Sequence, residues 1–309
     1  MLPYFGKFPE WFDAWKISAL NNSSIDFLIY TDSDNIVSQG NLKVIRTSFV
    51  NFKAKLQSIF DFTIKCDIPY KLCDYKPCYG KALHDDLKDY DFWGHCDADM
   101  IFGNIRKYIS DDILDNIEKV FTNGFLTIYR NNEKMNNLFL DDGVYPEFNY
   151  KEVYSTNHPC YFDEYSGMGL KCIRKKIKVF ENKWFLDLSV SDNSFHHAGK
   201  QIICLFDKGR LYEVDENGIK NEVIFVHIQK REMKIFGVLG NKFVITPGRI
   251  FAVDCDFDKA WFDINQGRNY KYKYWIKRTV KIIKDKSVIW RIKKYIRVRK
   301  QFKYLRTLR

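Results

Sequence analysis

The chain has 309 residues, of which 46% are apolar and 17% aromatic, and 50 Lys and Arg stand against 39 Asp and Glu. This composition excludes a disordered chain, and 16 Gly and 7 Pro are too few for a fibrous or low-complexity protein. The length suits one large domain or two small ones. No apolar run approaches the ~20 residues of a membrane span, and the start lacks a signal-peptide layout, so we expect a cytoplasmic protein.

The positive charge is concentrated at one end of the chain. Residues 271–309 hold 16 Lys and Arg and a single acid, whereas residues 1–270 hold 34 bases and 38 acids. The two parts need separate explanations. The sequence predicts a mildly acidic globular body over 1–265 and a basic amphipathic helical tail over 266–309.

Eight cysteines are scattered over the body, and no two of them form a C-x-x-C pair. A body of this size needs no disulfides, so we expect reduced thiols. A zinc site at Cys66, Cys73, Cys78 and the pair 95–96 is the alternative, and the spacing does not favour it.

Strand and helix signals alternate through the first half, in the βαβα order typical of an α/β sheet. Strands are expected at 25–31, 42–46, 91–96 and 125–129, and helices at 49–60, 79–87 and 110–120. The second half is less regular. A long aromatic-rich loop is expected at 141–165, a helix at 169–177, and short strands at 184–190, 201–206, 223–228 and 242–245.

Two carboxylates, Asp97 and Asp99, follow the apolar strand predicted at 91–96. Carboxylates are hard oxygen ligands suited to Mg²⁺ or Mn²⁺, and ligand sites in open α/β sheets lie beyond the carboxyl ends of strands. A solvated turn is the alternative, but apolar residues flank the triplet on both sides. His227 ends another predicted strand and could be a third metal ligand, with Lys230 near enough in sequence to meet a phosphate. A core histidine and a surface lysine are the alternative.

Two further segments carry candidate chemistry. Asp163 or Glu164 could deprotonate an acceptor hydroxyl as a general base, or could instead cap the helix that follows. In the segment 69–80, aromatic residues are mixed with Asp74 and Lys76, a composition that suits a nucleotide base, ribose and phosphate. An ordinary aromatic-rich loop is the alternative.

Together the motifs resemble a family of bacterial GT-A-type glycosyltransferases found in surface-polysaccharide gene clusters. The segments that carry the resemblance are, in chain order, 3–9, 27–32, 69–80, 91–104, 162–164 and 227–230. The resemblance implies an α/β fold with a GT-A-like, Rossmann-type mixed sheet flanked by helices. It also implies a nucleotide-sugar-binding half at 1–130 and an acceptor-facing half at 131–265.

The resemblance also implies a reaction and the residues that serve it. The donor would be a nucleoside-diphosphate sugar, and the acceptor a surface-polysaccharide or lipid-linked glycan. Asp97, Asp99 and His227 would hold Mn²⁺ or Mg²⁺, and Lys230 would bind phosphate, as in retaining GT-A enzymes. The positions implied near the donor nucleotide are Asp32, Asp74, Lys76 and Tyr79. Whether transfer retains or inverts the sugar configuration stays open.

The chain departs from the family pattern at its start, where only Met1 and Leu2 precede the segment 3–9. A GT-A sheet usually opens with a full apolar strand. Either the first strand is a stub or the start lies upstream.

The basic tail repeats apolar residues at helical spacing, at 276, 280, 283, 289, 292 and 296, with Lys and Arg elsewhere. This pattern is typical of a helix in a membrane interface, so we expect a peripheral protein at the inner face of the bacterial plasma membrane. Nucleic-acid binding is a less favoured alternative. A helix that only covers the body, with its cations facing outward, is a further alternative without a binding function.

Two other functions compete with glycosyl transfer. A sugar nucleotidyltransferase shares this sheet type, but it needs a Gly-rich loop after the first strand, and residues 3–9 hold a single Gly. A non-enzymatic protein that binds membrane or nucleic acid through residues 271–309 is the other.

Overall fold

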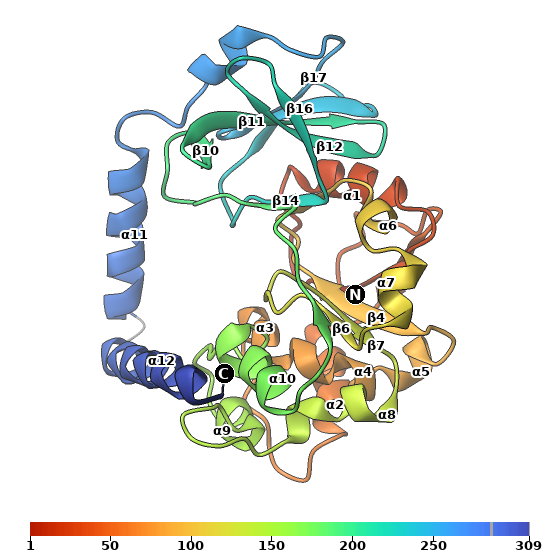
Figure 1. Cartoon of the computed structure of the whole chain (residues 1–309), viewed down its shortest axis with the longest axis vertical. Coiled ribbons are helices and arrows are strands. Elements are labelled where there is room, and N and C mark those ends of the chain that lie inside the picture. Colours follow the sequence, from red (N-terminus) through yellow and green to blue (C-terminus); the bar gives the residue numbers. More distant parts are fainter. Residues whose placement is uncertain (285–286, 309) are drawn as a thin grey trace.

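A computed structural model describes residues 1–284 and 287–308. The protein is mixed α/β, which confirms the class expected from the sequence. A central sheet lies among short helices, a second sheet stands above it, and two helices run along one side (Figure 1).

Two sheets, β3-β2-β1 and β4-β7-β6-β8, are joined edge to edge through Met1, and we call them together the central sheet. Its strands are β1 (Leu2–Pro3), β2 (Phe27–Thr31), β3 (Leu42–Arg46), β4 (Phe92–Cys96), β6 (Lys119–Val120), β7 (Leu126–Arg130) and β8 (Val179–Phe180). Met1 joins β1 to β4, because its amino group donates to Gly94 O (2.7 Å) and its carbonyl accepts from Cys96 N (3.2 Å). This is the parallel pattern, in which one residue bonds both neighbours of its partner. The carboxyl ends of β1 to β4 therefore share one edge.

Strand β2 is buried on both faces, which explains its continuous apolar sequence. Tyr30 packs against Phe52 of α2 (Phe49–Gln57), with ring centroids 5.2 Å apart. Phe27 points to the other face and meets Trp15 of α1 (Phe12–Leu20) at 5.5 Å. The period of two in a strand thus divides the core between two layers of helix.

A second, mostly antiparallel sheet carries residues 195–252. Its strands are β10 (Phe195–His197), β11 (Lys200–Asp207), β12 (Arg210–Asp215), β13 (Lys220–Val223), β15 (Lys234–Phe236), β16 (Lys242–Thr246) and β17 (Arg249–Ala252). A three-stranded sheet of β5 (Met100–Phe102), β14 (Phe225–His227) and β9 (Leu186–Asp187) lies between the two larger sheets (Figure 1). It joins the turn after β4 to the second half of the chain.

Several expected elements are shorter than predicted or absent. The helix expected at 110–120 covers only α7 (Asp111–Asp115), because Lys119 and Val120 leave it to pair with β8. The helix expected at 79–87 is divided into α4 (Tyr79–Ala82) and α5 (His84–Leu87). The loop expected at 141–165 contains α9 (Tyr150–Tyr154). The remaining short helices are α3 (Leu72–Tyr75), α6 (Ile105–Tyr108), α8 (Glu133–Asn136) and α10 (Leu170–Arg174), with a π-helical turn at Tyr165–Gly169.

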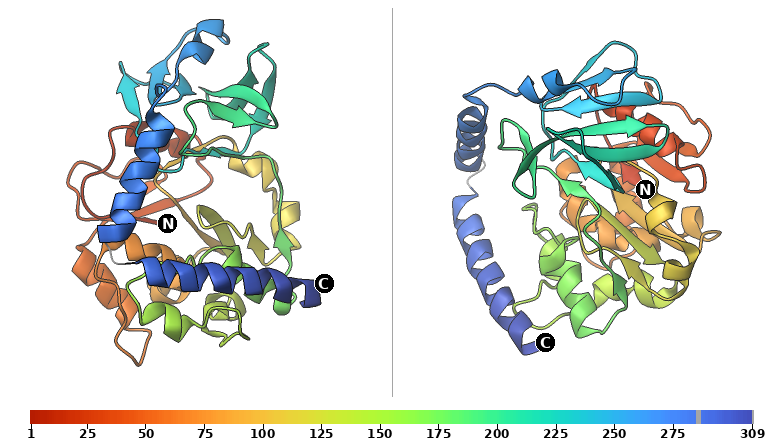
Figure 2. Two further views of the ribbon diagram at one scale, coloured as in Figure 1. Left: turned by 90° about the vertical axis from the view of Figure 1, so that its left-hand side faces the viewer. Right: turned by 45° about the horizontal axis from the view of Figure 1, so that its top comes forward.

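The C-terminal residues form two helices, α11 (Tyr270–Lys284) and α12 (Val288–Leu308), at an angle to each other along one side of the molecule (Figure 2). Among the described residues, no helix combines the length and apolarity needed to cross a membrane. The central sheet extends past residue 130, since β8 at 179–180 pairs with β6. The expected halves at 1–130 and 131–265 therefore share one sheet. All eight cysteines are unpaired.

Candidate functional site

Asp97, Asp99 and His227 converge at the carboxyl edge of the central sheet. The two acids lie in the turn between β4 and β5, and His227 ends β14. Because β14 pairs with β5, His227 stands opposite Met100, one residue beyond Asp99. One ligand atom from each of the three side chains lies within 4.8 Å of the other two, and no other such group of His, Cys, Asp or Glu occurs in residues 1–284 and 287–308.

Hydrogen bonds orient the imidazole of His227. Its Nδ1 lies 2.8 Å from Asp187 Oδ1, and its Nε2 lies 3.4 Å from Asp99 Oδ1. Burial lowers the pKa of His227, but these two carboxylates outweigh burial and raise the pKa to about 9. Asp187 in β9 was not singled out from the sequence, and an acid inside a predicted strand was the only available signal.

The three side chains fit a divalent cation. Asp99 is buried, and its Oδ2 has no hydrogen-bond partner in the described structure. A buried carboxylate oxygen without a partner is costly, and a cation would satisfy it. Asp187 would then hold Nδ1–H of His227 and leave Nε2 free to coordinate, an arrangement common around metal-bound histidines. Two carboxylates and one imidazole suit Mn²⁺ or Mg²⁺.

Lys76 connects the acids of the turn to the segment that holds Asp163. Its buried ammonium lies 2.6 Å from Asp97 Oδ1 and 3.2 Å from Asp163 Oδ2, and it also donates to Gly124 O. A Cβ on Gly124 would lie 2.8 Å from Asp163 Oδ2, so only glycine allows this approach. Burial raises the pKa of Asp163 to about 8 despite the charge of Lys76. Asp163 Oδ1 has no hydrogen-bond partner among the described residues, and Glu164 is exposed beside it.

Asp74 and Tyr79 lie in the core rather than on the surface of the cleft. Asp74 is fully buried, pairs with Lys71 Nζ (2.6 Å), and accepts from the backbone N–H groups of Cys160 and Phe162 (both 2.8 Å). These bonds fix the chain just before Asp163. Tyr79 is buried and donates its hydroxyl to a backbone carbonyl. A direct nucleotide contact by either residue stays a prediction, and their contacts give both a positioning role.

Asp32 stands exposed at the carboxyl end of β2. Its Oδ1 accepts from Gly6 N (2.8 Å), a glycine with φ of +94°. This bond holds the loop after β1 next to the loop after β2, over the same sheet edge as Asp97. A nucleotide contact by Asp32 stays a prediction.

Lys230 lies in a sharp turn directly after β14. Gln229 and Lys230 have φ of +54° and +58°, which bulky residues rarely adopt. Gln229 donates to Asp187 Oδ1 (2.6 Å), which ties the turn to the partner of His227. Lys230 Nζ lies over the ring of Tyr70, 4.5 Å from its centroid. Residues in such sparsely populated backbone conformations often cluster at functional sites.

The C-terminal helices also reach the site. Lys281 of α11 lies 5.8 Å from the ring centroid of Tyr70, on which Lys230 also packs. Lys294 of α12 lies 3.2 Å from the ring centroid of Tyr161, and its Nζ has no hydrogen-bond partner in the described structure. Burial lowers the pKa of Lys294 to about 8. The sequence pattern of the tail did not predict these contacts.

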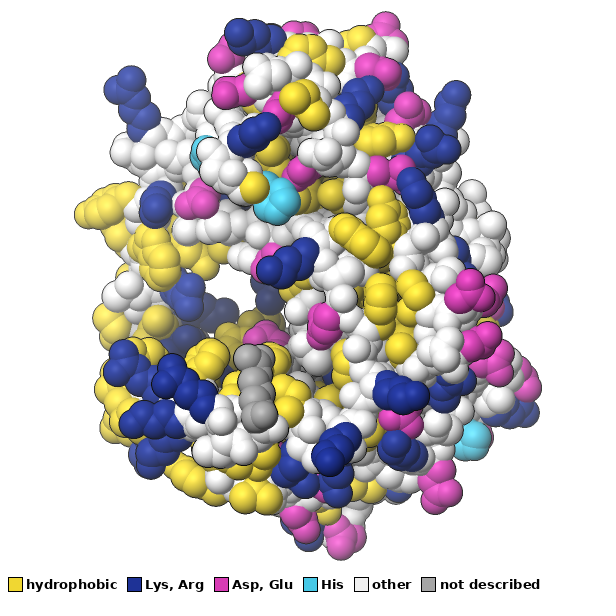
Figure 3. Space-filling view, viewed as in Figure 1, with side chains coloured by type: hydrophobic (Ala, Val, Ile, Leu, Met, Phe, Trp, Pro, Cys, Tyr) yellow, Lys and Arg dark blue, Asp and Glu magenta, His cyan; other side chains and the backbone are white. Residues whose placement is uncertain are grey.

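One hollow adjoins the site. A cavity of about 660 Å³ lies between the turn at 229–232 and α11, and Lys230, Lys273 and Lys277 are among its lining residues. Figure 3 shows that the surface is hollowed between α11 and the body, with Lys and Arg around the opening.

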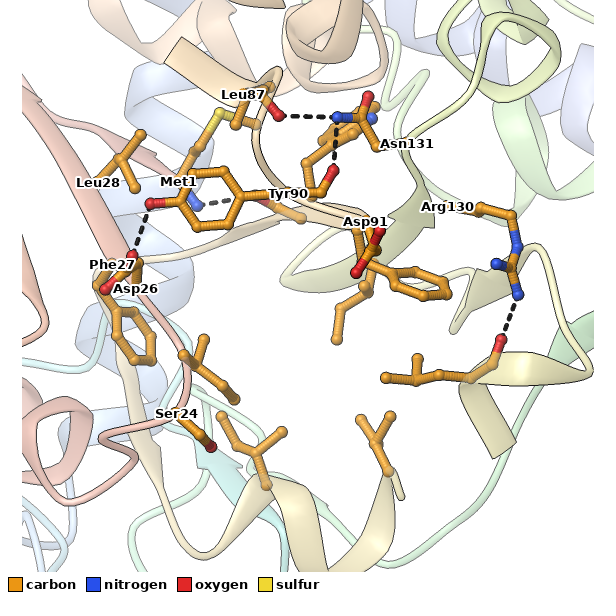
Figure 4. A pocket seen from close by; sticks show the side chains of 18 of the residues that line it. Met1, Ser24, Asp26, Phe27, Leu28, Leu87, Tyr90, Asp91, Arg130 and Asn131 are labelled. Carbon is orange, nitrogen blue, oxygen red and sulfur yellow. Dashed lines mark hydrogen bonds between the residues drawn. The ribbon is translucent and has the colours of Figure 1, made fainter. Parts of the chain in front are cut away.

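A second cavity, of about 1120 Å³, lies at the opposite edge of the central sheet (Figure 4). Met1, Phe27 and Asp91 line it, and none of the metal candidates does. Strand β1 covers only Leu2 and Pro3, so no strand separates the first residues of β2 from those of β4. The cavity is thus a product of the short first strand and is separate from the site.

Comparison with known proteins gives a family without a function. Residues 1–254 match a family of unknown function, DUF6625, and α11 and α12 lie beyond the match. No curated protein and no solved structure matches the chain. Because the match covers all strands and the Asp97–Asp99–His227 group, the chain is a member of the DUF6625 family.

Proposed function

We propose that this protein is a metal-dependent glycosyltransferase with a GT-A-like fold. It would move a sugar from a nucleoside-diphosphate sugar to a hydroxyl of a surface-polysaccharide or lipid-linked glycan, at the inner face of a bacterial plasma membrane. The convergence of Asp97, Asp99 and His227 beside Lys230 carries the proposal. The parallel order β3-β2-β1-β4, with the site at its carboxyl edge, supports it.

Different side chains at the site would bind different parts of the donor and its cation. Asp97, Asp99 and His227 would hold the cation, and Asp187 would keep the His227 ring in place. A divalent cation there would neutralise charge that develops on the departing diphosphate. Lys230 would donate to a phosphate oxygen, where its positive charge counts most in a partly dry cleft.

Asp163 and Glu164 are the candidates for the acceptor side. For an inverting transfer, Asp163 is the better general base, because its Oδ1 has no hydrogen-bond partner in the part of the chain that the structure describes and its pKa of about 8 lies close to neutral pH. For a retaining transfer, no such base is needed, and the two carboxylates would orient the acceptor hydroxyl. Lys76 keeps Asp163 next to Asp97 in either case.

Nucleotide binding measured by thermal shift tests the proposal. The wild type is melted with UDP, GDP, CMP or dTDP nucleotides, with and without Mn²⁺. We expect one nucleotide to raise the melting temperature by roughly 5 °C at about 100 times its dissociation constant, and only with the metal. Asp99→Asn should lose that shift, because it removes the buried anionic ligand but keeps the shape.

Asp215→Asn is the matched control. Asp215 is as buried as Asp99 (5% and 4% exposed) but lies in the second sheet and pairs with Lys200. This variant should melt lower yet keep the metal-dependent shift. If no nucleotide shifts the folded wild type, or if both variants behave alike, the glycosyltransferase proposal fails, and the C-terminal helices become the functional part.

A further inference from the structure

Helix α12 contacts the body through a mixed face, which includes hydrogen-bonding groups, Trp290 and the buried Leu305. Arg297 donates to the carbonyl of Pro146 (2.9 Å), and Gln301 donates to the same carbonyl (3.1 Å). Trp290 stacks on His158 with ring centroids 5.2 Å apart. These residues recur every four or seven positions and therefore define one side of the helix.

The opposite side of α12 is apolar and exposed, with Ile289 at 70% exposure. The other large apolar residues exposed on α12 are Val288, Ile292, Tyr295, Ile296 and Phe302. Spacings of three and four place them on one stripe. The inner side of α12 therefore combines polar groups with the packed Trp290 and Leu305, while a row of large apolar side chains is left exposed on the side away from the body.

Helix α11 is oriented in the same way. Lys277 pairs with Glu232 (3.4 Å), Lys281 lies over Tyr70, and no residue of α11 is buried. The large apolar residues exposed on α11 are Tyr272, Trp275, Ile276, Val280 and Ile283. We call the exposed apolar residues of α11 and α12 together the outer face. Figure 2 shows that both helices lie along the same side of the molecule.

Cations accompany the outer face on both helices. The guanidinium of Arg278 lies 5.1 Å from the ring centroid of Trp275, and that of Arg299 lies 4.9 Å from that of Tyr295. Residues 271–309 hold 16 Lys and Arg against one acid, and Figure 3 shows yellow and dark blue side chains gathered over these helices. A protein partner with an apolar groove would not need this density of charge, whereas an anionic lipid surface attracts each cation and admits the apolar stripe.

We propose that the outer face of α11 and α12 binds the surface of an anionic lipid bilayer, with both helices lying in the plane of the interface. The inference does not depend on glycosyl transfer. Because Lys281 and Lys294 project from the inner side of the same helices, binding would bring the cleft beside Tyr70 and Tyr161 close to the lipid headgroups.

Co-sedimentation of the full chain with lipid vesicles tests the proposal. Vesicles of phosphatidylcholine with one quarter phosphatidylglycerol are compared with vesicles of phosphatidylcholine alone. We expect at least tenfold tighter binding to the anionic vesicles, weakened by salt. The double variant Ile283→Ser, Ile289→Ser keeps the charge and should lower binding at least tenfold, because it removes apolar contact with the acyl boundary.

The double variant Val37→Ser, Val238→Ser is the matched control. Both valines are exposed (71% and 91%) but lie on the body. It should bind as the wild type does. Equal binding to neutral and anionic vesicles, or no loss in the Ile283, Ile289 variant, would overturn the proposal. The proposal would also be overturned if the protein bound duplex DNA and the Ile283, Ile289 variant lost that binding as strongly. The same holds if the wild type formed a dimer without lipid and the variant were a monomer.

Discussion

The carboxyl edge of the central sheet and helix α12 place charged side chains in opposite ways. In and beneath the site, several buried charges are held by a partner of opposite charge, as Lys71 holds Asp74 in the core and Asp187 holds His227 at the sheet edge. In α12, Arg297 bonds to backbone carbonyls at the surface while the apolar side is exposed. The comparison teaches that the site is rigid because charges inside a protein need fixed partners. Helix α12 is attached to the body by a few hydrogen bonds, and its exposed apolar side remains available for the lipid surface proposed above.

The largest expected effect comes from breaking the buried Lys71–Asp74 pair beneath the site. Asp74→Asn should lower the free energy of unfolding by about 3–5 kcal/mol, because it leaves the charge of Lys71 buried without its partner. Urea unfolding measures the change. Asp67→Asn is the control: Asp67 also pairs with a lysine, Lys53, but that pair is exposed, and its loss should cost less than about 1 kcal/mol. Similar losses of unfolding free energy in both variants would contradict the view that burial determines how much an ion pair contributes to stability.

A smaller effect depends on pH and concerns Asp163. Burial raises the pKa of its carboxyl from the ordinary 3.8 to about 8. The folded protein therefore binds this proton more tightly than the unfolded chain does. Asp163 therefore costs stability increasingly as the pH rises from 3.8 to 8, and the cost is complete above 8. Asp163→Asn removes this cost. Relative to the wild type, its melting temperature should rise by a few degrees between pH 5 and pH 9.

The measurement for Asp163 is a set of melting curves at pH 5, 7 and 9 without metal ions. Glu164→Gln serves as the control, since Glu164 is the neighbouring acid and is more exposed than Asp163, although burial raises its pKa as well. Its difference from the wild type should change less with pH. A difference for Asp163→Asn that stays constant between pH 5 and 9 would show that Lys76 keeps the carboxyl ionised throughout.

The smallest expected effects are on the local stability of α12, measured without lipid for one substitution on each side of the helix. Leu305 is buried on the inner side, and Leu305→Ser should lower the free energy of local opening of α12 by about 1–2 kcal/mol. Ile289→Ser on the outer face should change it by less than about 0.5 kcal/mol. Hydrogen exchange of the α12 amides distinguishes them. Equal protection losses would mean that the outer face already has a partner in the isolated protein.

Local sequence patterns correctly predicted those elements that depend mainly on residues close together in the chain. Strand β3 occurs at 42–46 as expected, and β4 runs directly into the Asp97–Asp99 turn. The candidate metal ligands could be named because carboxylates after a buried strand and a histidine at a strand end are informative without coordinates. By contrast, the helix expected at 110–120 stopped early, since pairing with β8, about sixty residues later, overrides local helical spacing.

Only the tertiary structure could decide which side chains meet and which way a face points. Asp187 and Lys294 carry no local signal, and they matter because β9 pairs with β14 and because α12 packs across Tyr161. The stripe in the tail was visible in the sequence, but its direction was not, because a periodic pattern defines a face without saying what lies against it. Sequence determines periodicity through local backbone geometry, whereas pairing and orientation depend on contacts between residues far apart in the chain.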